Sequence, residues 1–476
     1  MEKSTTHKKR RHVFLEKAFE KPFRTFERIS SNGGLTLLFV GTIALIWANS
    51  PLQELYTYLV EEFHVSIDLH SDIGGFGVGM HSIHWINDGL MTLFFLMAGL
   101  EIKREMLAGE LSDFKQAILP IFAAAGGMLV PILIYKCFSI GMDDAVVHGW
   151  GIPMATDIAF SIGILSLLGN RVPLSLKVFL TALAIVDDLG GVLVIALFYT
   201  SQINFTYLFI ALALFGVISV LNLVFNVEKL SPYLIIGCFI WYFMLQSGIH
   251  STIAGVLVAI ATPLRPRVTS TVFIDGIKEV LPTLTELKVG NKEGRYTTVV
   301  LSQEQMAGVH AIHELVKNIQ SPLQYLEQRL HEVVNYVVLP LFALANSGVI
   351  VYNYASDVQP ELFSIVTVAI AASLFVGKTI GITLFSWFAV KLGLAEKPKG
   401  SSWHTMMGIA MIGGIGFTMS LFIASLAFSD PNVLTQAKLG IFIGSTLAGV
   451  CGYFYLRYSL ARDEKNYAHI KSEEQE

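Results

Sequence analysis

Apolar stretches of about 20 residues recur along this chain, and each is long enough to cross a bilayer as a helix. Of its 476 residues, 53% are hydrophobic and 15% are charged, whereas a soluble domain carries about 25% charged residues. Inside a bilayer every backbone polar group must be bonded within the protein, so such spans are helical. The sequence therefore predicts an all-α polytopic membrane protein. Twelve transmembrane helices are expected, at roughly 35–50, 86–104, 116–138, 150–168, 174–199, 206–226, 231–246, 249–263, 331–350, 363–391, 404–427 and 437–457.

Lysine and arginine fall on alternate loops between these spans. The loops 51–85, 139–149, 200–206, 247–250, 351–362 and 429–437 contain neither residue. The other side carries the basic N-terminal tail and Lys103, Arg104, Lys115, Arg171, Lys177, Lys229, Arg265, Arg267, Lys391, Lys397, Lys399, Arg457, Arg462 and Lys465. Because cytoplasmic loops are enriched in these residues, the pattern predicts cytoplasmic termini and a multi-pass protein of the inner (plasma) membrane.

The expected organisation has five parts. A basic cytoplasmic segment, 1–34, precedes spans one to eight (35–263), a cytoplasmic insertion (264–330), spans nine to twelve (331–457) and a cytoplasmic tail (458–476). Within the first part, Val13–Ile29 alternates Phe with charged residues, which fits either an amphipathic helix on membrane lipids or a disordered basic tail. No cleaved signal peptide is expected. Cys137, Cys238 and Cys451 lie in apolar runs and suggest no disulfide frame.

Two loops are long enough to have structure of their own. The outer loop 51–85 contains HVSIDLHSDIGGFGVGMHSIHWI, whose alternation around Gly74-Gly75 predicts an extracytoplasmic β-hairpin turning at these glycines. The insertion contains a helical run predicted from Ser302 to Leu330, with His310 and His313 on one face. Two histidines do not close a metal site, so a solvated face is expected there.

Span five, VFLTALAIVDDLGGVLVIALF, carries Asp187 and Asp188 near its middle. An acid at that depth costs about 2.5–3.5 kcal/mol on insertion scales and usually marks an ion path or a proton relay. Neighbours on a helix point about 100° apart, so a single basic partner cannot neutralise both. One aspartate is expected to face a base and the other a cavity.

Further intramembrane features accompany these acids. Asp157 follows Thr156 in a span interrupted by Gly and Pro, and MIGGIGFTMS interrupts span eleven. Such breaks are tolerated where they line a cavity, and paired interruptions in two halves point to a transporter's binding site. Close packing of small residues is the alternative for the glycines, and a local hydrogen bond is the alternative for Asp157. Lys378 lies deep in span ten, where its expected partner is an aspartate.

These residue types suit exchange of a hard cation for protons. Carboxylate, hydroxyl and carbonyl oxygens bind hard cations, and a desolvated carboxylate also favours its protonated form. Competition between the two at one site, combined with alternating access, is sufficient for antiport.

The motifs ATDIAF (155–160), RVPLSLKVFLTALAIVDDLGG (171–191), LPLFALANSGV (339–349), GKTIGITLF (377–385) and IGFTMSLFIASLAF (415–428) resemble the NhaA family of sodium/proton antiporters. The resemblance covers nearly all spans. It implies twelve helices, inverted repeats built from spans three to five and ten to twelve, and broken helices four and eleven crossing near the midplane. It further implies electrogenic exchange of Na⁺ or Li⁺ for H⁺ in pH and sodium homeostasis, without a cofactor.

The resemblance also implies residue roles. Asp188 is the expected principal ligand of the transported Na⁺ and carrier of the proton, and Asp187 its neighbour paired with Lys378. Asp157 with Thr156 lies between the short helices. The pH-sensing and accessory positions are Asp88, Glu101, Glu105, His250, Glu327 and His331.

One position departs from the family pattern, because Gln324 replaces a basic residue shortly after Ser-Pro. The insertion before it is also longer than in the best-known members. Members dimerise partly through the outer hairpin, so a homodimer through 51–85 is expected, with no nucleic-acid partner.

Three other functions compete with antiport. A sodium-coupled symporter needs a pocket for an organic solute. An intramembrane aspartyl protease needs two aspartates facing each other across a water, which the consecutive Asp187 and Asp188 cannot provide. Asp157 with Asp188 could in principle form such a pair, but Lys378 would compete for the shared proton. A channel also lines its path with acids and stays open as an alternative. No enzymatic activity is expected.

Overall fold

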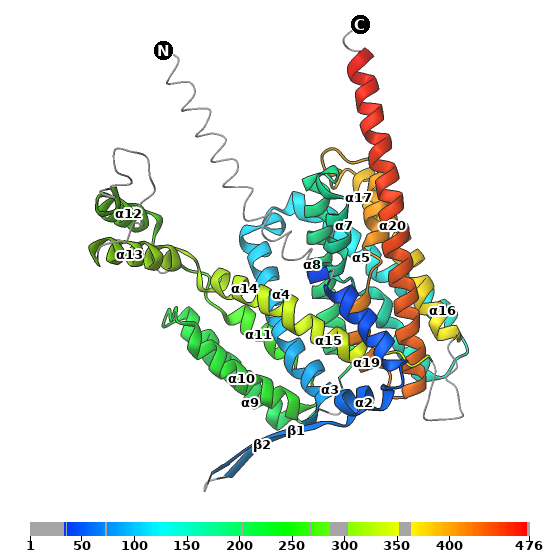
Figure 1. Ribbon diagram of the computed structural model, residues 1–476, viewed down its shortest axis with the longest axis horizontal. Coiled ribbons are helices and arrows are strands. Elements are labelled where there is room, and N and C mark those ends of the chain that lie inside the picture. Colours follow the sequence, from blue (N-terminus) through cyan, green and yellow to red (C-terminus); the bar gives the residue numbers. More distant parts are fainter. Residues whose placement is uncertain are drawn as a thin grey trace.

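Helices form the body of the protein, as shown in Figure 1. The computed structural model describes residues 33–34, 36–71, 74–200, 203–266, 268–285, 303–351 and 363–473. Within them, 7 helices are long and apolar enough to cross a membrane, or up to 9 if each of two bent pairs counts as one span. The all-α membrane class is thereby confirmed, whereas the count of twelve spans and the inverted repeats stay predictions.

The first half of the chain begins with an apolar helix, Thr36–Ala48. It continues with α2 (Gln53–Thr57), η1 (Tyr58–Glu62), β1 (His64–Ser71), β2 (Gly74–His81), α3 (Ser82–His84), η2 (Trp85–Leu90), α4 (Met91–Ala108), η3 (Glu110–Ser112), α5 (Phe114–Phe138), α6 (Asp144–Val147), η4 (His148–Met154), α7 (Ile158–Leu167), η5 (Gly169–Arg171) and α8 (Leu174–Phe198).

The second half of the chain is also built mainly from helices. Its elements are α9 (Phe205–Leu223), α10 (Leu230–Ser247), α11 (Ile253–Ala261), α12 (Ser270–Thr285), α13 (Gln303–Ile319), α14 (Pro322–Val333), η6 (Val334–Val338), α15 (Leu339–Asn346), α16 (Ile365–Ala372), η7 (Ser373–Gly377), α17 (Lys378–Lys391), α18 (Trp403–Ile412), α19 (Phe417–Ala427) and α20 (Pro431–Glu473).

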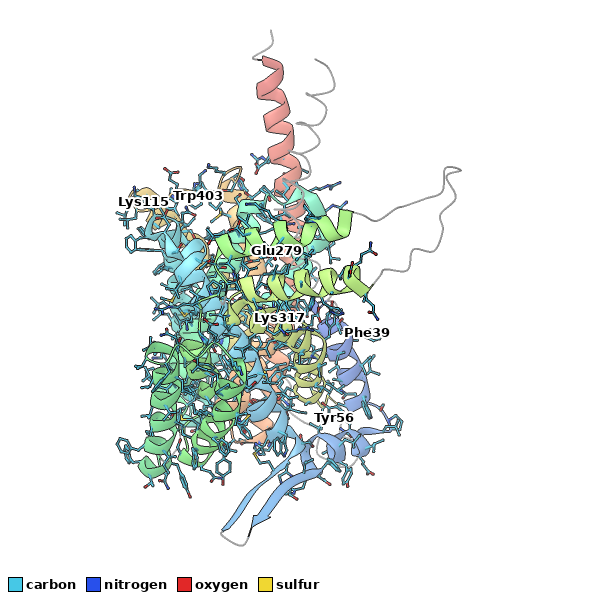
Figure 2. All side chains as sticks on the ribbon, turned by 90° about the vertical axis from the view of Figure 1, so that its left-hand side faces the viewer. Phe39, Tyr56, Lys115, Glu279, Lys317 and Trp403 are labelled. Carbon is cyan, nitrogen blue, oxygen red and sulfur yellow. The ribbon has the colours of Figure 1, made fainter. Side chains whose placement is uncertain are left out.

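The predicted hairpin is present as the antiparallel pair β1–β2, which projects from one end of the bundle in Figures 1 and 2. Its turn is not at Gly74-Gly75 as predicted, because both glycines are already paired in β2, with Ser71 and His70 as partners. Alternation of side chains locates strands well, but it does not distinguish a turn glycine from a strand glycine. Figure 2 shows Lys115 and Trp403 at the opposite end of the bundle.

The insertion forms two helices, α12 and α13, where one was predicted. The run expected from Ser302 to Leu330 ends at Ile319, and a new helix, α14, starts after Ser321. Ser321 caps α14 because its Oγ accepts from Gln324 N at 3.2 Å while Gln324 Oε1 accepts from Ser321 N at 3.4 Å. This capping box sets the start of α14 at Pro322, before the span that hydropathy predicted from about 331. His310 and His313 are exposed on α13.

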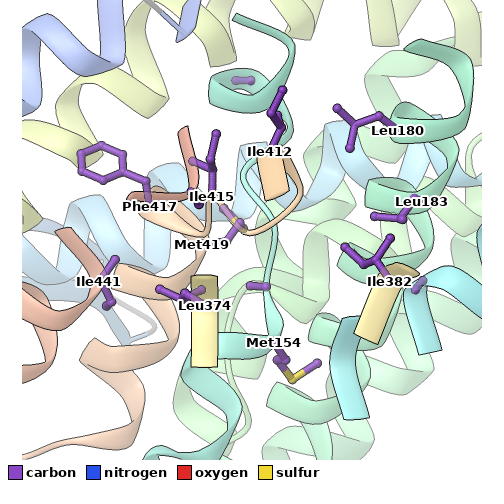
Figure 3. Packing of buried hydrophobic residues seen from close by; sticks show 14 of the residues in the cluster. Met154, Leu180, Leu183, Leu374, Ile382, Ile412, Ile415, Phe417, Met419 and Ile441 are labelled. Atoms are coloured by element: carbon purple, nitrogen blue, oxygen red, sulfur yellow. The ribbon is translucent and has the colours of Figure 1, made fainter. Parts of the chain in front are cut away.

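Two helix pairs bend sharply and lie at the centre of the bundle. The pair that ends with α7 is bent by 45°, and the pair α18 and α19 by 48°. Buried apolar side chains surround the second bend, including Ile412, Ile415 and Phe417 in Figure 3. The main core therefore packs directly around the two interruptions, which places any polar group there out of contact with lipid.

Candidate ion-binding site

The two bent pairs bond to each other at their interruptions, between η4 and α7 and between α18 and α19. Asp157 N donates to Ile415 O at 2.7 Å, and Thr156 Oγ1 donates to Gly413 O at 2.9 Å. A broken helix leaves backbone groups without their helical partners, and at membrane depth water cannot replace them. Each break therefore satisfies the polar groups of the other, which fixes the crossing.

Asp157 lies where both short helices begin. Its Oδ1 accepts from Phe160 N of α7 at 2.9 Å. Its Oδ2 accepts from Thr418 N at 3.1 Å and from Thr418 Oγ1 at 2.5 Å, at the start of α19. A helix N-terminus carries a partial positive charge, so one carboxylate caps two helices that approach each other at their positive ends. Asp157 therefore makes the local hydrogen bond that the sequence offered as one alternative, and it also lines a cavity, which was the other.

Lys378 is fully buried and lies against Asp187, the kind of partner that the sequence predicted. Its Nζ donates to Asp187 Oδ2 at 2.5 Å and to Thr156 Oγ1 at 2.5 Å. A π-helical segment, η7, ends directly before Lys378, so the lysine lies at the junction of η7 and α17, beside the crossing. A buried ion pair is tolerated only when its polar atoms find partners, and the hydroxyl of Thr156 supplies one of them.

Asp188 lines a small cavity on another side of α8. The cavity has a volume of about 30 Å³, which is enough to hold a water molecule. Asp188 is only 5% exposed. The cavity wall also contains Glu101, Asp157, His331, Asn335 and Thr418. The two adjacent aspartates therefore have different surroundings, Asp187 against a lysine and Asp188 against a small cavity.

A cavity with a larger volume, about 410 Å³, lies between α4, α9 and α11. It is lined by Lys103 and Arg265 and by none of the predicted ion-binding residues. Two basic side chains do not bind a cation, so the small acidic cavity is the better candidate.

A second charged cluster lies beside the cavity, at the end of α4. Arg104 Nε donates to both carboxylate oxygens of Glu327, at 3.0 and 3.1 Å, and Arg104 Nη1 contacts Glu105 Oε1 at 2.7 Å. Burial raises the pKa of the Glu327 carboxyl, and the Arg104 guanidinium opposes that rise. His331 Nδ1 lies 3.6 Å from Glu101 Oε1 and connects this cluster to the cavity.

Asp88 and His250 form a separate group, outside the cavity wall. His250 Nε2 lies 3.7 Å from Asp88 Oδ1, and His84 Nδ1 lies 3.8 Å from Asp88 Oδ2. Ser251 Oγ donates to the same carboxylate at 3.3 Å. These residues are at the hairpin end of α4, where η2 begins the span. The predicted accessory residues thus fall into two groups, one on each side of Asp188.

Sequence reasoning missed three residues at this site. Arg104 was assigned only to the basic side of the membrane, although its position between Glu101 and Glu105 on one helix was a signal for pairing. Thr418 comes two residues after Gly416, the last glycine of the break, which marked its N–H and hydroxyl as donors at the start of a new helix. Asn335 had no sequence signal.

Comparison with known proteins identifies the family of this chain. The family model described as Na⁺/H⁺ antiporter 1 matches residues 24–456. The chain is 44% identical over 450 residues to "Na(+)/H(+) antiporter NhaA" of Bacteroides fragilis, covering 93% of this chain and 99% of that protein. It is 46% identical over 447 residues to the protein of the same name from Sulfurimonas denitrificans, covering 93% and 97%. The chain therefore belongs to the Na⁺/H⁺ antiporter 1 family.

Proposed function

We propose that this protein exchanges cytoplasmic Na⁺ or Li⁺ for external H⁺ across the bacterial inner membrane, in the service of pH and sodium homeostasis. Members of its family are transporters and not enzymes. The observation that carries the proposal is the cavity of about 30 Å³ at the crossing of the two bent pairs, with Asp188 in its wall. Its size suits a cation stripped of most of its water.

In the proposed cycle, ionised Asp188 binds the cation and protonated Asp188 releases it. Oxygens of Asp157 and Thr418 complete a hard-ligand wall. Asp187, Thr156 and Lys378 adjoin this wall and hold a second titratable pair within hydrogen-bond distance. Electrogenic exchange requires more than one proton per cation, and the core contains more than one group able to carry a proton.

Access to the cavity would alternate between its two sides. Glu101 and His331 line it toward the Arg104 cluster, which we assign to the cytoplasmic funnel with Glu105 and Glu327. Asp88 and His250, near the hairpin, would lie toward the external side. Rocking of the crossed helices against the rest of the bundle would expose Asp188 first to one group and then to the other.

The competing functions fit this site less well. A symported organic solute needs far more room than about 30 Å³. A protease dyad needs two free carboxylates sharing one water, but both oxygens of Asp157 already accept hydrogen bonds from α7 and α19. The remaining alternative is a channel, which would pass cations without moving protons in exchange.

The experiment is the collapse of a preset pH gradient in inside-out membrane vesicles after Na⁺ or Li⁺ is added. We expect wild type to dissipate the gradient and Asp188→Asn to lose this response, because a neutral amide cannot exchange a proton for a cation. Asp275→Asn, which removes an acid that is 74% exposed on α12, serves as the matched control and should behave as wild type. A wild type that ignores both cations at every pH refutes antiport, and uptake of labelled solutes then tests the symporter.

A further inference from the structure

Asn335 lies in the wall of the cavity that contains Asp188, on a different helix from every acid there. It belongs to η6 of span nine, whereas Asp188 is on α8 and Glu101 on α4. Its side chain is 3% exposed, and its Nδ2 has no hydrogen-bond partner among the described residues. Buried amides nearly always have partners, so an unpartnered NH₂ group in a cavity wall indicates that an acceptor inside the cavity supplies the contact, and the same amide turned over presents its oxygen there.

The local backbone supports this assignment. Asn335 occupies a π-helical segment, and such single turns are frequent at functional sites. In the part of the chain that the structure describes, η2 contains Asp88 and η7 ends directly before Lys378, so two of the three other π-helical segments, all but η1, adjoin predicted functional residues. The one in span nine adjoins Asn335.

The same segment aligns a row of side chains along the cavity. His331, Asn335 and Leu339 are each four positions apart, and all three line it. In a regular α-helix such residues drift by about 40° per step around the axis. The wider π turn counteracts the drift and keeps the amide beside the cavity.

We infer that Asn335 is a neutral ligand of the transported cation and helps to set the affinity for Na⁺ and Li⁺. An amide carries an oxygen that binds a hard cation and an NH₂ that donates to a carboxylate. Rotation about its last side-chain bond exchanges the two, so the same residue serves the cation-loaded and the proton-loaded cavity. This inference rests on the proposed exchange at Asp188.

The test measures exchange rates in inside-out vesicles over a range of Na⁺ and Li⁺ concentrations. Asn335→Leu keeps the shape of the side chain without its polar atoms, and Asn335→Asp keeps an oxygen ligand. We expect Asn335→Leu to raise the apparent KM for Na⁺ about tenfold, which corresponds to the loss of one contact to a charged group. The KM for Li⁺ should rise by a different factor. The maximal rate should stay within about twofold, and Asn335→Asp should keep a KM near that of wild type.

The matched control is Ser386→Ala, which also removes a buried polar atom without a partner in the described chain, on α17 and outside the cavity wall. It should leave both KM values unchanged. If Asn335→Leu does not accumulate in membranes, Asn335→Ser replaces it. The readout is then the rise in Tm of the purified protein caused by Na⁺, which should shrink relative to wild type.

The outcomes separate the two proposals. Normal exchange by wild type with an unchanged KM in Asn335→Leu overturns the role of Asn335 alone. A lower maximal rate at unchanged KM overturns it too, since that pattern reflects structure and not cation binding. A wild type without cation-dependent exchange overturns the proposed function, and this inference with it.

Discussion

At the scale of single residues, neighbouring positions in the sequence have different surroundings. Asp187 bonds to Lys378, while Asp188, the next residue, borders a cavity. Asp157, another acid at the crossing, holds two helix ends together. Three carboxylates of the same chemistry thus have three kinds of surroundings, namely a lysine side chain, a small cavity and the backbone amides of two helix ends.

The first residue-scale prediction concerns the buried pair. Lys378→Met leaves Asp187 buried without its charged partner, which should cost about 3–5 kcal/mol of stability. The double variant Lys378→Met with Asp187→Asn removes both charges and should recover most of the loss. The measurement is thermal unfolding of the purified protein in detergent. Equal Tm values for the single and the double variant would contradict the pairing.

The second concerns the doubly capping aspartate. Asp157→Ala removes caps from α7 and α19, and each cap is worth about 0.5–2 kcal/mol, so the loss should be about 1–4 kcal/mol. Asp157→Asn retains an acceptor and should lose less. The control is Asp113→Ala, which removes the single cap of α5 and should cost about half as much. Thermal unfolding ranks the three, and a loss in Asp157→Ala no larger than in Asp113→Ala would count against the double cap.

At the scale of elements, small residues allow close approach of the helices that support the site. A Cβ atom added to Gly381 on α17 would collide with the carbonyl oxygen of Gly126 on α5, and one added to Gly126 would collide with that of Gly381. Without a hydrophobic driving force between spans, such contacts are a main source of association in a membrane. Because α17 begins with Lys378, this contact also positions the lysine.

The element-scale prediction compares two glycines in spans. Gly381→Ala should destabilise the protein by about 1–3 kcal/mol, since α5 and α17 must separate to admit the methyl group. Gly216→Ala on α9 is the control, because its Cβ would have no heavy atom within 4 Å and alanine favours the helix by up to about 1 kcal/mol. The Tm of the two variants should therefore shift in opposite directions. A neutral Gly381→Ala would refute the tight contact.

At the scale of the whole molecule, the helical bundle and the hairpin are joined through a small base. Ser82 N donates to Phe63 O at 2.8 Å, and Ser82 Oγ donates to Leu59 O at 2.6 Å. The two strands extend away from the bundle beyond this base (Figure 2). A projecting pair of strands offers edges to a second copy of the chain, which is how we expect the homodimer to form.

The whole-molecule prediction is that deleting residues 66–79 yields a monomer with an intact bundle, because the base contacts of Ser82 remain. Molar mass from light scattering of the protein–detergent complex tests this, with the deletion beside wild type. Retained dimer mass in the deletion variant would place the interface elsewhere. The thermal unfolding curve of the variant is the check that its helices still pack.

Sequence alone determined the helical membrane class and the bounds of several helices, although the helix expected at about 437–457 runs from Pro431 to Glu473. Span five was expected at about 174–199 and is Leu174–Phe198, and span three at about 116–138 is Phe114–Phe138. Hydropathy is a local property of the sequence. It predicts spans well because no backbone polar group can stay unbonded in a bilayer, so an apolar segment that crosses it must be a helix. The start of α14 was missed because a capping box, and not hydropathy, decides it.

Tertiary structure alone decided what each polar residue touches. Lys378 and Asp187 are 191 positions apart, and Asp157 and Thr418 are 261 apart, so no local pattern contains these contacts. Which of two adjacent aspartates faces the lysine depends on the rotation of α8, and that rotation follows from packing. The place of Asn335 depends in addition on a single wide helical turn. The sequence supplied the polar groups, and the crossing of two broken helices assigned each of them its partner.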